Sequence, residues 1–179
     1  MSQVIELEKA RLSFAARRGY RNWISTFDEE FDVSTKLSDL SVATLAYLAH
    51  AQDRSTFYLY DLIMNIEDLG SGLEFNQLPG DKKMAVIDRY LFVLDRIRFE
   101  CMKRLGWLDS YPGEDLPLVE MIARFEEIAP ALHARIPLLS KRHPAFETYS
   151  SLNRFDQETF IRKLIPKALK EIQDYSTTL

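Results

Sequence analysis

Cysteine and histidine are scarce in this chain of 179 residues, which limits the metal chemistry it can support. Cys101 is the only cysteine, so an intrachain disulfide and a zinc site built on cysteines are both excluded. None of the three histidines has a glutamate three residues before it, so the Glu-x-x-His pairs of di-metal helical bundles are missing. We therefore expect no metal ion and no cofactor. A lone thiol also favours a reducing, cytoplasmic location.

Glycine, alternating strand patterns and long apolar runs are also lacking. With six glycines and no convincing alternation of apolar and polar residues, the sequence predicts an all-α fold. No stretch approaches eighteen uninterrupted apolar residues, so we expect no membrane-spanning helix. Glu6 and Glu8 stand where a secretory signal would need an apolar segment. The net charge of −4 argues against a general nucleic-acid-binding protein, because such proteins normally carry a basic excess.

Aromatic residues, by contrast, are plentiful at 12% of the chain. These side chains bury large areas, so they indicate either a well-packed core or an adhesive surface. The length fits one compact helical domain over residues 1–179. A sub-boundary near 109–115 stays open, because prolines become frequent beyond Pro112.

Two long helices are expected at the centre of the bundle, over residues 40–69 and 82–105. Gly106 suits the position just after the second of these helices, and Trp107 is expected to fold back on its last turn. Shorter helices bounded by prolines should wrap the centre, because proline removes a hydrogen-bond donor and clashes with the preceding turn. The proline-bounded ranges are 116–128, 131–141, 145–152 and 157–174, the last capped by Asp156 and kinked or interrupted at Pro166. Two further helices, over 2–18 and 20–31, are expected before the centre.

The first central helix contains a polar interruption, "QDRST". On one unbroken helix Gln52 and Thr56 would fall in the middle of the apolar face, and each would need a buried partner. A break near residue 53 avoids this cost, with Asp53 capping a second helix. We favour the break and keep the single helix as the alternative.

Four residues are candidates for binding a ligand. His50, Arg54 and Asp61 lie on the polar side of the first central helix, where a histidine can act as a base and an arginine can hold an anion. Arg98 interrupts the apolar stripe of the second central helix, one turn after Asp95. A buried guanidinium needs a carboxylate, so Arg98 is either half of a structural pair with an acid or an anion contact in a pocket.

Four aromatic residues are candidates for an interaction surface. Phe92 and Phe99 lie off the main apolar stripe of their helix, which indicates either a helix covered on two sides or a self-association surface. Phe57 and Tyr58 stand on the polar side of the first central helix, where a neighbouring element or a partner could cover them.

A basic cluster near the N-terminus could contact nucleic acid or an anionic membrane, but the acids around it favour an intramolecular match. Its members are Lys9, Arg11, Arg17, Arg18 and Arg21.

No catalytic constellation stands out in the sequence. Neither GxSxG nor HExxH is present, and "GSG" at 70–72 lacks the lysine of a phosphate-binding loop. Our leading hypothesis is a non-enzymatic cytoplasmic interaction or regulatory protein that binds a protein partner or forms a homodimer. The alternative is a small anionic-ligand-binding protein or a helical enzyme with a pocket at the central helices.

Overall fold

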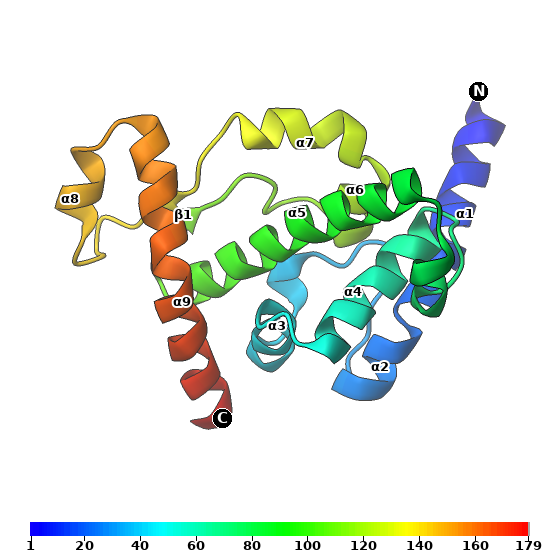
Figure 1. Ribbon diagram of the computed structural model, residues 1–179, viewed down its shortest axis with the longest axis horizontal. Helices are drawn as coiled ribbons and strands as arrows, with labels where there is room; N and C mark the ends of the chain where they lie inside the picture. Colours follow the sequence, from blue (N-terminus) through cyan, green and yellow to red (C-terminus); the bar gives the residue numbers. More distant parts are fainter. Residues whose placement is uncertain (179) are drawn as a thin grey trace.

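Helix α5 (Gly80–Arg104) runs through the middle of the structure, and the other elements are arranged around it (Figure 1). The computed structural model describes residues 1–178. The remaining helices, in chain order, are α1 (Ser2–Gly19), α2 (Arg21–Phe27), η1 (Leu37–Asp39), α3 (Val42–Ala49), α4 (Asp53–Ile66), η2 (Gly72–Gln77), α6 (Leu118–Ala123), α7 (Phe125–His133), α8 (Phe146–Ser150) and α9 (Arg154–Thr178). The all-α prediction is confirmed, with the single addition of a two-stranded sheet.

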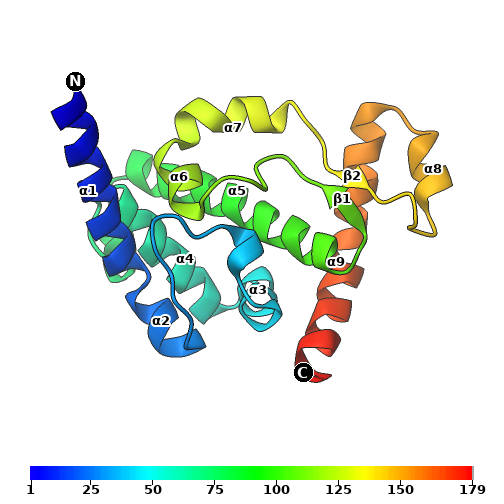
Figure 2. The same ribbon diagram turned by 180° about the vertical axis from the view of Figure 1, so that it is seen from behind.

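The elements lie on both sides of α5 and across its two ends. Figures 1 and 2 show α7 along one side, and α3 and α4 along the other. Helix α9 crosses the end of α5 near Arg104, whereas α1 stands at the opposite end and packs against α4. The two termini therefore lie at opposite ends of the molecule.

The expected helix over 40–69 is two helices, so the predicted break is confirmed. Helix α3 ends at Ala49 and α4 begins at Asp53. Between them Ala51 adopts a left-handed conformation with a φ of 52°. The cap differs from the prediction: Gln52 is the N-cap residue, and Asp53 is already helical. The Ser55 hydroxyl donates a hydrogen bond to the Gln52 carbonyl at 2.8 Å, which holds the first turn.

The end of α5 follows the prediction closely. Gly106 is left-handed with a φ of 77°, its amide donates to the Lys103 carbonyl, and the Trp107 amide donates to the Met102 carbonyl. This is the Schellman arrangement expected from "GW" after an apolar stripe. Helix α4 ends in the same way, but Asp68 rather than Gly70 takes the left-handed position, with a φ of 57°.

The prolines divide the C-terminal third less than expected. Pro117 does precede α6, but Pro130 lies inside α7, and α9 continues through Pro166. The predicted helix over 131–141 is therefore wrong beyond His133. Residues Leu138–Leu139 instead form strand β2, which pairs antiparallel with β1 (Leu108–Ser110).

The start of α9 also differs from the prediction. Asn153 rather than Asp156 caps it, because the Asn153 side-chain oxygen accepts from the Asp156 amide at 3.0 Å. The predicted range, 157–174, begins three residues after the observed start of α9 at Arg154.

Two clusters of buried side chains form the core. The larger one joins α1 to α7 around Trp23, Leu45 and Leu62, and also includes Ile172 of α9. The smaller one lies between α5, the short sheet, α8 and α9, around Phe99 and Ile165. Helix α5 supplies side chains to both clusters, so it connects the two ends of the molecule.

Cys101 is fully buried within the larger cluster, and its titration should limit stability at high pH. Burial raises the pKa of its thiol from 9.0 to about 12. Because the folded pKa is the higher one, the stabilisation is complete below pH 9 and is lost as the pH rises towards 12. The free energy of unfolding should therefore fall by up to about 4 kcal/mol over this range. Urea titrations of Cys101→Ala should show a shallower alkaline decline than wild type, and equal slopes would contradict the assignment.

Candidate functional site

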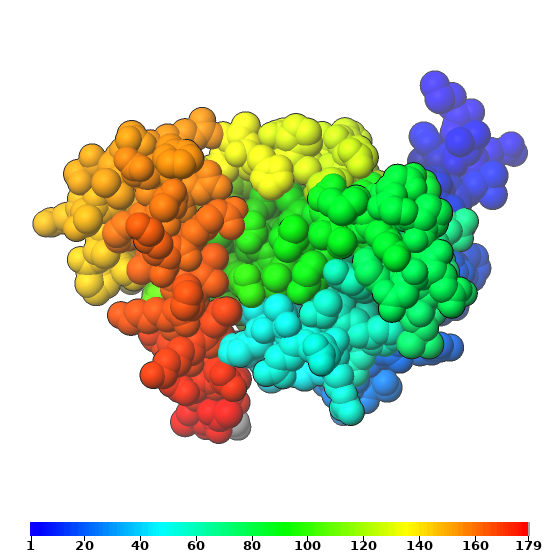
Figure 3. All heavy atoms as spheres, in the orientation of Figure 1, coloured from blue at the N-terminus to red at the C-terminus, as the bar shows by residue number. Residues whose placement is uncertain are grey.

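A recess on the surface of α5 contains Arg98, the principal ligand-binding candidate. It has a volume of about 490 Å³ and lies where α5, α7 and α9 meet, at the junction of the green, yellow and orange atoms in Figure 3. We call it the Arg98 recess; it is lined by Asp88, Leu91, Phe92, Leu94, Asp95, Arg98, Phe125, His133 and Arg162. It is open to solvent and mixes acidic with basic groups, so the side chains largely neutralise one another.

Arg98 itself is half-buried and has a backbone partner. Its Nε donates to the Ala49 carbonyl at 3.1 Å, and Ala49 is the last residue of α3. A cation at this point stabilises carbonyl groups that have no partner within their own helix. Asp95, the acid expected beside it, instead accepts from Arg162 at 2.9 Å. Arg98 therefore joins α5 to α3, and within residues 1–178 no carboxylate forms an ion pair with its terminal nitrogens.

His50 lies away from this recess, at the junction of α3 and α9. Its Nδ1 is 2.8 Å from the Ala46 carbonyl oxygen, and its Nε2 is 2.9 Å from the side-chain oxygen of Gln173. A small recess of about 220 Å³ adjoins it, lined in part by Tyr47 and Thr177. The histidine thus connects α3 with the last turns of α9.

Arg54 and Asp61 occupy two further places. Arg54 is exposed in the first turn of α4, whereas Asp61 is buried with 5% of its surface exposed. The Asp61 carboxylate accepts from the Gly72 amide at 2.7 Å and from the Asn22 side chain at 3.3 Å. It therefore holds the η2 segment and α2 onto α4. The structure does not bring the four ligand-binding candidates together.

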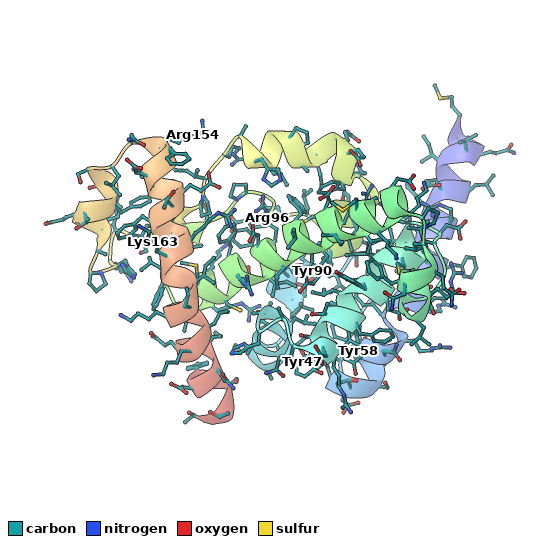
Figure 4. The ribbon with its side chains drawn as sticks, viewed as in Figure 1. Tyr47, Tyr58, Tyr90, Arg96, Arg154 and Lys163 are labelled. Atoms are coloured by element: carbon teal, nitrogen blue, oxygen red, sulfur yellow. The ribbon has the colours of Figure 1, made fainter. Side chains whose placement is uncertain are left out.

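The four aromatic candidates are covered within the chain to different degrees. Phe92 and Phe99 are 3% and 1% exposed, so the expectation that they form an outward surface is wrong for these two rings. The alternative, a helix covered on two sides, is the one observed, because α7 and the β1–β2 segment cover this side of α5. Phe57 is half-buried against Gly72. Tyr58 stacks on Tyr47 with ring centroids 6.1 Å apart. Figure 4 labels both tyrosines, on α3 and α4.

Two buried arginines of α5 were not identified from the sequence. Arg89 is 7% exposed and pairs with Glu67 at 3.1 Å and with Glu126 at 3.4 Å. Arg96 is 3% exposed, and its guanidinium lies 4.4 Å from the centre of the Phe92 ring. Both lie outside the apolar stripe, so the hydrophobic periodicity of α5 gives no indication that they are buried.

Large apolar side chains are exposed along the first half of α1. Val4, Ile5 and Leu7 expose between 54% and 71% of their surface, and Phe14, further along the helix, exposes 58%. Every residue from 1 to 11 is exposed, and Figure 3 shows this end of the helix projecting beyond the rest of the molecule. The basic residues of this helix stand out in the sequence, whereas the exposure of its apolar ones becomes clear only from the fold.

The basic cluster around α1 is partly matched within the chain. Arg11 pairs with Glu8 at 2.7 Å and donates to the Ile66 carbonyl at 3.0 Å. Arg18 donates to the Asn65 side chain at 3.4 Å. The bonds to Ile66 and Asn65 hold α1 against α4.

Comparison of the chain with known proteins identifies no relative. No family model, curated protein or solved structure that was compared with the chain matches it. Within residues 1–178, no three His, Cys, Asp or Glu side chains are grouped so that they could hold a metal ion. Over the same residues, no helix has the length and apolar character needed to cross a bilayer.

Proposed function

We propose that the chain is a non-enzymatic cytoplasmic interaction protein whose projecting helix α1 binds a second copy of the same chain. The observation that carries this proposal is the exposed apolar surface of Val4, Ile5 and Leu7 on a helix end without neighbours. The single buried thiol, Cys101, supports the cytoplasmic assignment, because it needs no oxidising compartment.

The way in which α1 packs lower down indicates how its free end is used. Near α4 its contact residues are small: Ala15, Ala16 and Gly19 are buried. A Cβ added at Gly19 would lie 2.7 Å from Leu62 Cδ1 and 3.1 Å from Leu62 Cα, so the two helices are in close contact. Towards the N-terminus the apolar residues Val4, Ile5 and Leu7 are larger, and more than half of the surface of each is exposed. An isolated helical segment of this length is only marginally stable in water, so a covering partner would stabilise it.

Charge along the free end supports pairing between two copies. Glu6 precedes Lys9 by three residues, and neither makes an ion pair among the described residues. When two α1 helices pair antiparallel, the acidic part of one faces the basic part of the other. A two-fold axis then makes both contacts at once. The small area of such a contact predicts a weak dimer.

Light scattering coupled to size exclusion, over about 1 to 100 μM chain, tests this proposal. Wild type should shift with concentration from 20.9 kDa towards twice that mass. The double variant Val4→Asp/Leu7→Asp should remain at the monomer mass throughout, because charge at the contact opposes association.

The control is Leu73→Asp, which introduces an aspartate elsewhere on the surface, at an apolar residue that is 79% exposed. It should dimerise like wild type. A wild-type chain that stays monomeric at every concentration, or a double variant that dimerises unchanged, would contradict the proposal.

Binding of a small anion at the central helices is the second candidate function. It is favoured by Arg98, which lines a recess and has no carboxylate partner. Arg162 stands in the same recess, but Asp95 and Glu158 already neutralise it. We therefore place this function second.

A further inference from the structure

Arg96 is a buried cation without a polar partner. Only 3% of its surface is exposed, and the described residues form no hydrogen bond or ion pair with it. Its guanidinium carbon lies 4.4 Å from the centre of the Phe92 ring and 5.6 Å from that of Phe99. Figure 4 shows Arg96 on the side of α5 that faces α7.

The acids near Arg96 are already bound to another group. Asp95 accepts from Arg162 at 2.9 Å, and Glu158 accepts from the same guanidinium at 3.4 Å. Neither carboxylate is therefore free to serve as the counter-ion of Arg96.

The Tyr111 hydroxyl also lies near Arg96, but it donates to Glu100 at 2.7 Å. The guanidinium therefore lies against the rings of Phe92 and Phe99, and a second cation nearby, Arg162, repels it.

An arginine in this position carries its charge at neutral pH. Burial, opposed mainly by the attraction of Asp95, lowers the pKa of Arg96 to about 10, which still leaves it protonated at pH 7. Stacking on aromatic rings recovers part of the cost of burying a cation, but a guanidinium has five N–H donors that the rings leave largely unused. A buried charge without a counter-ion is costly, so an anion at these donors would stabilise the fold.

The guanidinium is not sealed on every side. Of its three nitrogens, only Nε is both fully enclosed and without a partner, so the terminal nitrogens keep contact with solvent. Next to it lies Gly113, which has a φ of 90° and would place an added Cβ 3.9 Å from Nε of Arg96 and 3.0 Å from Leu132 Cδ1. Glycine at this position thus lets the backbone approach the guanidinium closely, where a side chain would crowd Leu132.

Gly113 also forms part of the wall of a second recess, which has a volume of about 400 Å³. We call it the Gly113 recess; it is lined by residues 110–116 together with Leu132, Arg135, Ile136 and Leu138. Arg135 brings a second positive charge to this recess. Two acids line the recess, Glu114 and Asp115. Lys103 neutralises Glu114, so Asp115 is the acid that opposes the charge of Arg135. The recess is large enough for a small ligand, and Gly113 in its wall is the residue that lies next to Arg96.

We propose that Arg96 binds a small oxyanion, a carboxylate or a phosphate, which enters from the Gly113 recess and accepts hydrogen bonds from the terminal nitrogens of the guanidinium. Arg135 attracts the anion at the entrance, and the rings of Phe92 and Phe99 hold the guanidinium plane in place. This site is separate from the Arg98 recess, and it does not depend on pairing of α1.

Thermal unfolding in different anions at constant ionic strength tests the site. Inorganic phosphate or acetate at about 10 mM should raise the midpoint of wild type by about 3 to 8 °C relative to chloride, because a ligand that binds only the folded state stabilises it. Comparison of the two anions shows which class binds more tightly. Arg96→Met keeps an unbranched chain between the two rings and should lose the rise.

The matched control is Arg154→Met, which removes an exposed arginine at the start of α9 and should keep the full rise. Calorimetric titration of phosphate or acetate should give at least tenfold weaker binding to Arg96→Met than to Arg154→Met. The proposal is overturned if neither anion stabilises wild type, or if Arg96→Met responds as wild type does. Both readouts are independent of the oligomeric state, so a monomeric wild type would leave this result unaffected.

Discussion

Replacing Trp23 with alanine is expected to lower the free energy of unfolding by about 3 to 5 kcal/mol, the range for removing a large buried aromatic side chain. Trp23 is completely buried. Its ring meets those of Tyr20 and Phe31 edge to face, with centroids 5.2 and 5.5 Å away. Its Nε1 donates to the Tyr58 carbonyl at 3.2 Å, so the same side chain fastens α2 to α4. Removal leaves a cavity that these rigid rings cannot fill.

Urea unfolding monitored by circular dichroism measures this loss. Ile24→Ala is the matched control, because Ile24 is the next residue of α2 and is 42% exposed. It should cost less than about 1 kcal/mol. Trp23→Phe should fall between the two, since it keeps an aromatic ring and loses the N–H donor. A cost for Trp23→Ala no larger than that for Ile24→Ala would show that this cluster does not hold the fold.

Replacing Arg104 with methionine is the second large effect that we expect. Arg104 Nε donates to the Glu100 carboxylate at 2.9 Å, and its Nη2 donates to the Ser38 and Leu40 carbonyls at 2.6 and 2.8 Å. Glu100 is 2% exposed, so the variant leaves a buried carboxylate with a single neutral donor, the Tyr111 hydroxyl. The expected cost is about 2 to 4 kcal/mol, because an uncompensated buried charge is added to the loss of two backbone contacts.

A double variant separates these two contributions. In Arg104→Met/Glu100→Gln the buried charge is gone, so part of the lost stability should return. Arg124→Met is the matched control, because Arg124 also pairs with a glutamate four residues earlier, Glu120, but on the surface. It should change the unfolding midpoint little. If Arg104→Met and Arg124→Met behave alike, the buried pair does not hold the 38–40 segment to α5.

Much of the helical architecture could be predicted because local chemistry determines it. The break between α3 and α4 follows from two polar residues, Gln52 and Thr56, that an unbroken helix would have buried. The end of α5 follows from a glycine and an apolar residue in sequence. The short sheet could not be predicted in this way, because β1 and β2 pair across about thirty residues and neither strand carries an alternating pattern of its own.

The site residues were harder to predict for a related reason. Periodicity identifies the most apolar face of a helix, but α5 is covered on several faces, and Arg96 is buried outside its apolar stripe. Arg98, within the stripe, is only half-buried because it lines an open recess, and its partner is the Ala49 carbonyl at the end of α3. The sequence makes Asp61 a candidate ligand-binding acid, but in the fold its carboxylate accepts a hydrogen bond from the Gly72 amide. Each of these depends on a contact between elements that the local sequence does not encode.

Helix α5 supplies Val93 and Ile97 to one buried cluster and Phe99 and Met102 to the other. Unfolding of either cluster would therefore remove side chains that pack against the other and would leave part of α5 without tertiary contacts. Neither end of the protein can melt while the other stays intact, so heating should produce one cooperative transition in place of two separate ones.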